Sequence, residues 1–314
     1  MVSTNDIQFL TYNNDVGFTI AGFDRSQPAA TLASTVTATN NRTLFTGAVV
    51  LNAGVDFETY ALRLDGDVTL GTATDNTAQL ILGSGGLIST GTRTIRSGIQ
   101  AGTGTSELLV FNTGTTAIGD FANPNTSGLI AANGITKFGG GTLQFLGNNA
   151  GFTGDIRVQQ GTVELNYRNT ADVSTNVVTT IGGNGGNIVF EGAGSILNLR
   201  GGQDGTGVNF TGQAVTFNKG IGLGDYVPTA TIRIDRSAGS AATSQNKTFI
   251  LTGGITFGQN NGDVGQVLRI DGRNSIRLQV DGTTTLNGRS SFAVENGYVG
   301  TANEAQQINL ITVG

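Results

Sequence analysis

Residue types that build many enzyme sites are absent from this chain. Among 314 residues there is no Cys, no His and no Trp. The lack of His excludes triads and proton shuttles that depend on an imidazole. The lack of Cys excludes thiolate nucleophiles, Cys/His zinc sites and disulfides. Only oxygen-ligand metals such as calcium stay open, and we predict no catalytic residue, no metal and no cofactor.

Strong charge and long apolar runs are also missing. Charged residues make up 12% of the chain, the net charge is -5, and the Arg residues are scattered. This pattern argues against nucleic acid and anionic membrane surfaces as partners. No apolar run approaches transmembrane length, and Met1–Asp6 has no signal-peptide character. We therefore expect a segment of a longer exported protein whose export signal lies elsewhere.

The chain is instead rich in glycine, with 50 Gly residues alongside abundant Thr and Asn. Gly, Thr and Asn disfavour helices, whereas Thr, Val, Ile and Phe suit strands. Gly and Asn also supply the left-handed backbone of tight turns. A hydrophobic fraction of 37% argues against disorder. The composition predicts an all-β protein with many short strands.

Short alternating segments support that prediction. They are Leu62–Leu64, Leu143–Phe145, Ile156–Val158, Val163–Leu165 and Ile232–Ile234. Each places two apolar side chains on one face with a polar side chain between them, as a half-buried strand requires. Phe side chains are expected to stack in the core rather than serve as ligand platforms.

Self-similar segments indicate a repeat architecture. Leu62–Gly66, Leu268–Gly272 and Leu278–Gly282 share one form, an alternating strand followed by Asp-Gly. The Asp-Gly pair predicts a sharp turn after the strand. Such turns could join the antiparallel hairpins of a β-sandwich, or they could form the corners of a parallel solenoid.

The spacing of the segments favours the solenoid. Leu143, Val163 and Ile188 lie roughly 20 to 25 residues apart, near one coil of a right-handed parallel β-helix. We predict one solenoid domain over residues 1–314 with roughly 13–14 coils at that period. An antiparallel β-sandwich is the alternative fold.

One stretch, residues 135–165, carries a more specific pattern. It opens with Ile-Thr-Lys, continues through a Gly-rich turn, Gly-Thr-Leu, Gly-x-Asn and Phe-Thr-Gly, and closes with Gly-Thr-Val. This order resembles the passenger-associated transport repeat, also called the autotransporter-associated β-strand repeat. Phe138 departs from the pattern, because the family usually has a small or polar residue there. The matching turn residues are Gly139, Gly140, Gly141, Thr142, Gly147, Asn148, Thr153, Gly154, Gly161 and Thr162.

The resemblance implies a right-handed parallel β-helix exported to the surface of a Gram-negative-type cell. It does not imply one activity, although passengers of this type include adhesins. We predict a non-enzymatic structural or adhesive role, as a stalk, scaffold or adhesin, because stacked coils satisfy their backbone groups internally and need neither disulfides nor metals. The partners would be cell-surface glycans or proteins, or further copies of the chain.

The alternative function is a β-helical polysaccharide lyase or hydrolase. Such enzymes use clustered carboxylates, and Asp65 and Asp67 form the closest acidic pair, with Arg63 nearby. Residues two apart on a strand share a face. The opposing interpretation is that Asp65-Gly66 is a turn, and the recurrence of Asp-Gly at Asp271 and Asp281 supports it.

Overall fold

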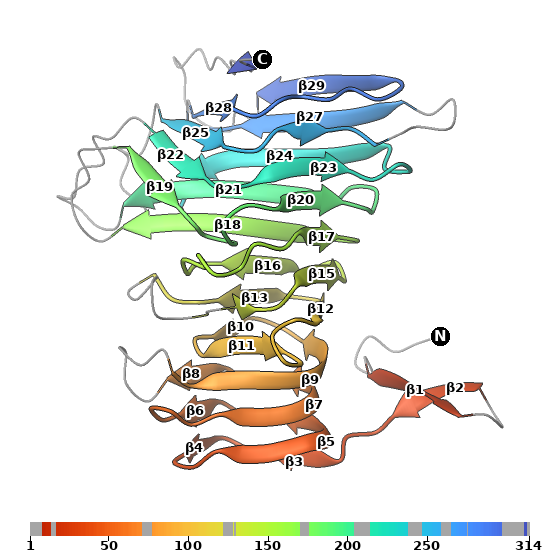
Figure 1. The fold of residues 1–314 in the computed structure, drawn as a ribbon, viewed down its shortest axis with the longest axis vertical. Coiled ribbons are helices and arrows are strands. Elements are labelled where there is room, and N and C mark those ends of the chain that lie inside the picture. Colours follow the sequence, from red (N-terminus) through yellow and green to blue (C-terminus); the bar gives the residue numbers. More distant parts are fainter. Residues whose placement is uncertain are drawn as a thin grey trace.

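The computed structural model describes residues 8–13, 17–70, 77–121, 128, 130–169, 176–203, 214–237, 247–258, 265–274, 276–296 and 311–312. Within these ranges every regular element is a strand. The strands stack in three parallel sheets, from N-terminal coils at the bottom of Figure 1 to C-terminal coils at the top. The predicted parallel β-solenoid is confirmed, and the antiparallel β-sandwich is wrong for these sheets.

One sheet contributes a single strand to each coil and has eleven strands. In stacking order they are β4 (Ala30–Leu32), β6 (Val49–Leu51), β8 (Val68–Leu70), β10 (Arg93–Ile95), β13 (Thr115–Ile118), β16 (Thr142–Phe145), β18 (Thr162–Asn169), β21 (Ile196–Gln203), β24 (Thr229–Arg236), β27 (Gln266–Gly272) and β29 (Ser290–Asn296).

A twelve-stranded sheet runs alongside it. Its main path is β3 (Arg25–Gln27), β5 (Val36–Phe45), β7 (Phe57–Leu64), β9 (Gln79–Ser89), β12 (Glu107–Asn112), β15 (Gly134–Phe138), β17 (Ile156–Val158), β20 (Asn187–Phe190), β23 (Gly220–Leu223) and β26 (Ile255–Thr256). Two further strands, β11 (Gly98–Ala101) and β14 (Ile130–Ala131), pair beside this path.

Two smaller sheets complete the structure. A five-stranded parallel sheet of the C-terminal half contains β19 (Val177–Thr179), β22 (Ala214–Phe217), β25 (Thr248–Leu251), β28 (Arg277–Val280) and β30 (Ile311–Thr312). Strands β1 (Phe9–Asn13) and β2 (Gly17–Ala21) form an antiparallel hairpin of their own. In Figure 1 this hairpin lies beside the first coils.

The coils are fewer and longer than the predicted 13–14. Stacked partners in the eleven-stranded sheet are 19 residues apart at Val49 and Val68 but 38 apart at Ile234 and Gly272. The five-stranded sheet is the reason, because it adds a third side to the C-terminal coils. A period taken from 143–188 therefore underestimates the later coils.

The predicted alternation places the core correctly. Leu62, Leu64, Ile232 and Ile234 are fully buried, and they join one continuous apolar stack along the interior. Eight of the 16 Phe residues are buried as well, including the edge-to-face pair Phe45 and Phe57, whose ring centroids are 4.8 Å apart. Burial of these side chains is the main force that stabilises the coils.

Two local predictions need correction. Phe138 is 38% exposed on the outer face of β15, so it is not a core residue. Asp271-Gly272 is the last pair of β27 rather than a turn, because both residues pair with β24 in the parallel ladder. Asp65-Gly66, by contrast, lies in a bend after β7.

Candidate functional site

The Gly-rich turns of residues 135–165 form corners where successive coils touch through their backbones. A Cβ atom on Gly141 would lie 2.1 Å from the carbonyl oxygen of Gly114 on the preceding coil. Gly161 has a φ of 79°, and a Cβ atom there would lie 2.5 Å from the oxygen of Gly141. Only glycine fits such a column without displacing backbone.

Several of the other predicted turn residues also connect successive coils. Thr142 and Thr162 are directly paired on β16 and β18, and Asn148 accepts a hydrogen bond from the Thr179 hydroxyl at 3.0 Å. The remaining ones differ from one another. Gly139 lies close against Asn112, Gly140 is exposed, Gly147 is buried, and Thr153 and Gly154 lie at another corner, on the rim of a polar pocket.

Lys137, inside the same motif, is a buried cation that the sequence alone did not single out. Its ammonium donates to the carbonyl oxygens of Phe138 at 3.2 Å, Gly139 at 2.6 Å and Gln160 at 2.9 Å. Three N–H donors meet three acceptors. Burial lowers the pKa of Lys137 to about 8, so the ammonium form prevails at neutral pH and ties two corners together.

Lys219 repeats this arrangement in the C-terminal half. It is fully buried, donates to the carbonyl oxygens of Gly154 and Gly185, and lies 5.2 Å from the centre of the Phe152 ring. Desolvation by burial lowers its pKa to about 8. Lys137 and Lys219 thus place an internal cation at a corner in each half of the solenoid, and Lys247 is a further buried lysine in the C-terminal half.

Asp65 and Asp67 have separate structural partners. Asp65 accepts from the Arg63 side chain at 3.2 Å and from the Thr90 hydroxyl at 2.5 Å. Asp67 accepts from the backbone N–H of Thr94 at 2.9 Å. Both carboxylates therefore connect their coil to the next one.

A larger polar cluster covers the outer face of the eleven-stranded sheet between β18 and β27. Its members are the outward residues of adjacent strands, which the parallel register aligns in columns. We call this cluster the charged face; it comprises Glu164, Asn198, Arg200, Arg233, Asp235, Asp271 and Arg273.

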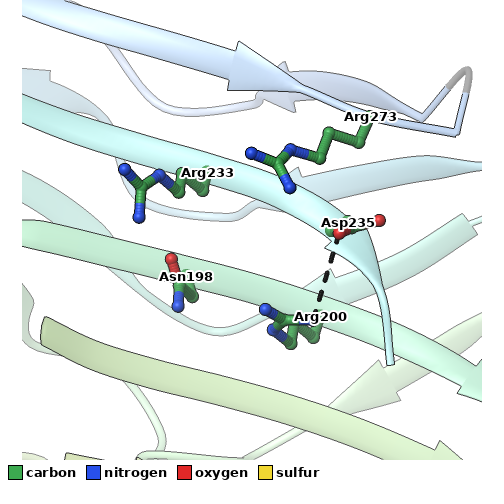
Figure 2. A pocket seen from close by; sticks show the side chains of 5 residues that line it. All are labelled: Asn198, Arg200, Arg233, Asp235 and Arg273. Carbon is green, nitrogen blue, oxygen red and sulfur yellow. Dashed lines mark ion pairs between the residues drawn. The ribbon is translucent and has the colours of Figure 1, made fainter. Parts of the chain in front are cut away.

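The charged face is hollowed by a small cleft of about 70 Å³. Figure 2 shows its side chains: Asn198 and Arg200 come from β21, Arg233 and Asp235 from β24, and Arg273 follows β27. The cleft thus combines three guanidinium groups with one carboxylate and one amide. Such a set of groups can hold a small polar or anionic group.

Glu164 anchors one end of the charged face. Its side chain is nearly buried and accepts hydrogen bonds from the side-chain amides of Gln144, Asn166 and Asn198. The Arg200 guanidinium also donates to it, at 3.0 Å. These four donors compensate a carboxylate that would otherwise be costly to bury.

The outer face of the twelve-stranded sheet is different in its N-terminal half. Ile88, Phe111 and Phe138 are stacked neighbours on β9, β12 and β15, with Tyr60 and Leu109 nearby. We call these five residues the apolar face. Together with Phe9 of the hairpin, they line a groove of about 710 Å³.

Among the described residues, no three acidic side chains gather closely enough to hold a metal ion. In the same part of the chain, no helix is long and apolar enough to cross a membrane.

Comparison with known proteins gives one informative similarity. No family model matches the chain, and no solved structure matches it. The chain is 28% identical over 246 residues to the adhesin BmaC autotransporter of Brucella suis biovar 1 (strain 1330). The match covers 76% of this chain but only 6% of that protein. This chain is thus similar, over three quarters of its length, to a short part of an autotransporter adhesin.

Proposed function

We propose that this chain is a non-enzymatic, adhesive passenger-type segment displayed on the outer surface of a Gram-negative-type bacterium. The observation that carries the proposal is the similarity to an autotransporter adhesin in a chain that folds as a parallel solenoid. The solenoid presents outer faces to a partner, and its partners are cell-surface glycans or proteins, or further copies of the chain.

Residues 135–165 are proposed to act as a passenger-associated repeat within this solenoid. Support comes from the corner glycines and from Lys137, which tie adjacent coils at the points where the motif is most specific. Such corners need neither disulfides nor metals, because stacked backbones satisfy their own hydrogen bonds. Corners of this kind suit an exported chain that has no Cys, because smaller extracellular domains rely on disulfides for their stability.

The test displays the 314-residue chain on a non-adherent bacterium and counts cells bound to an epithelial monolayer. We expect binding above that of cells displaying the anchor alone. Cells that display the Gly141→Val variant, in which the stacked corners would be disrupted, serve as the matched control. They should bind no better than cells displaying the anchor alone.

Absence of any gain in binding would overturn the adhesive proposal. The non-enzymatic part is tested separately with the purified chain on pectin and alginate, where we expect no turnover. Cleavage that is lost in Asp65→Asn and Asp67→Asn would establish the polysaccharide-active alternative instead.

A further inference from the structure

The cleft on the charged face contains guanidinium groups that the protein leaves largely free to bind another molecule. Arg233 and Arg273 approach Asp271 at 3.5 and 3.7 Å, distances at which charges attract but hydrogen bonds are weak. Among the described residues, neither guanidinium donates a hydrogen bond. Each one carries five N–H donors in a planar fork, so the cleft offers donors to an acceptor-rich group.

Two of the neighbouring carboxylates, in contrast, are satisfied from inside the protein. Asp235 accepts from the backbone N–H of Arg236 at 2.8 Å and from the Asn274 amide, while Glu164 has four donors of its own. Their negative charge is therefore partly compensated before any ligand arrives. This leaves the half-exposed Arg233 and Arg273 to dominate the open side of the cleft.

An acceptor on the cleft wall points to a second kind of group on the ligand. Among the described residues, the side-chain oxygen Oδ1 of Asn198, which lines the cleft, has no hydrogen-bond partner. A buried acceptor without a donor is costly. A hydroxyl group beside the anionic group would supply that donor, and sugars carrying carboxylate or sulfate substituents have both groups on one ring.

The shape of the site agrees with a polymer that carries such groups repeatedly. A cleft of about 70 Å³ has room for about two water-sized groups, hence for one anionic substituent. The face continues across β27 and β29, where Arg269 lies 3.4 Å from Glu295. Adjacent strands are about 4.8 Å apart, so a chain lying across them meets a new coil at each short step.

We infer that the charged face binds the carboxylate or sulfate groups of an acidic polysaccharide, with Arg233 and Arg273 as the anion-binding residues and Asn198 as a hydroxyl acceptor. This inference deepens the proposed adhesive function and rests on it, because it names the ligand class of the displayed surface.

The test measures binding of the purified 314-residue chain to immobilised polygalacturonate, heparin and dextran in 0.15 M salt. We expect binding to one or both acidic polymers and none to neutral dextran. The double variant Arg233→Gln/Arg273→Gln should weaken acidic binding about tenfold or more, since two charged contacts are lost. Asp271→Asn keeps an acceptor oxygen but removes the charge facing both guanidiniums, so it should tighten binding about threefold.

Arg157→Gln is the matched control, because Arg157 is equally exposed but lies on the twelve-stranded sheet. It should change affinity by less than about twofold. Preference for polygalacturonate assigns the site to carboxylates, and preference for heparin assigns it to sulfates. No binding to either acidic polymer, or equal loss in Arg157→Gln, overturns the inference. If displayed cells still adhere in that case, the adhesive function stands without it.

Discussion

The two outer faces of the solenoid differ in chemistry although both are built on stacked parallel coils of one solenoid. The apolar face on β9, β12 and β15 stacks Ile88, Phe111 and Phe138 as neighbours. The charged face on β21, β24 and β27 stacks Asn198, Arg233 and Asp271 in the same manner. In both, the parallel register converts one outward position per coil into a continuous column.

This difference shows where a solenoid can vary. Inward positions are fixed by the need for an apolar stack, and corner positions by the close approach of backbones. Outward positions carry neither constraint, so they can present an apolar groove in one half and a charged cleft in the other. Four predictions, from the largest expected effect to the smallest, test how far the two faces depend on the coils beneath them.

The largest effect is expected from Gly141→Ala, at a corner between the two halves. The new Cβ atom would meet the Gly114 carbonyl at 2.1 Å, and backbone on both coils would have to move. We expect a loss of about 3 kcal/mol in the free energy of unfolding, measured by denaturant titration.

Gly140→Ala is the control for Gly141→Ala, since a Cβ atom at Gly140 meets nothing within 4 Å. It should leave the denaturation midpoint nearly unchanged. Equal effects of the two variants would mean that corner contacts do not set the spacing of the coils.

The second prediction concerns the network beneath the charged face. Glu164→Gln replaces a carboxylate that accepts from four donors by an amide that turns N–H groups toward them. We expect a loss of about 2 kcal/mol. Glu295→Gln, on the same sheet but half-exposed and 3.4 Å from Arg269, should cost less than about 0.5 kcal/mol. Similar losses in both variants would show that Glu164 is not an anchor.

Much of this molecule follows from local sequence, but the two faces do not. Alternation in Val163–Leu165 and Ile232–Ile234 correctly predicts the buried apolar residues, with Glu164 and Arg233 on the outward side of their strands. Which outward residues become neighbours depends on coil length, and that varies between 18 residues at Arg25 and Thr43 and 38 residues at Ile234 and Gly272. No local sequence pattern indicates how many residues a given coil contains.

Individual residues illustrate the same limit. Asp271 has the Asp-Gly form of a turn, yet the longer C-terminal coil extends β27 through it and brings it to Arg233. Phe138 did leave a signal, because it departs from the repeat pattern at the position where the apolar face lies. Lys137 lies within that pattern, and two of its carbonyl partners follow it directly in the sequence, but the third, Gln160, is brought to it only by the fold.

The third prediction compares the two halves through their internal cations. Burial lowers the pKa of both Lys137 and Lys219 to about 8, from an ordinary value of 10.5. Between pH 8 and 10.5 the unfolded chain therefore binds more protons than the folded one, so the free energy of unfolding should rise with pH in this window. Below pH 8 these lysines should contribute no slope.

Denaturation midpoints between pH 7 and 9.5 measure this slope for the wild type, Lys137→Met and Lys219→Met. Each variant should lower the slope by removing one titrating group, and the double variant should remove most of it. If one single variant abolishes the whole pH dependence of stability, only the lysine replaced in that variant contributes to it. A midpoint that falls with rising pH in the wild type would contradict the assigned direction.

The smallest effect on stability is expected on the apolar face. Phe138→Ser removes a side chain that is already 38% exposed, so the free energy of unfolding should change by less than about 1 kcal/mol. Binding of a hydrophobic fluorescent dye should nevertheless fall, because Phe138 is part of the groove wall. Leu286→Ser, an exposed apolar residue outside that groove, should leave dye binding unchanged. If Phe138→Ser instead unfolds the chain, the apolar face is part of the core, and the contrast with the charged face is one of burial rather than of surface chemistry.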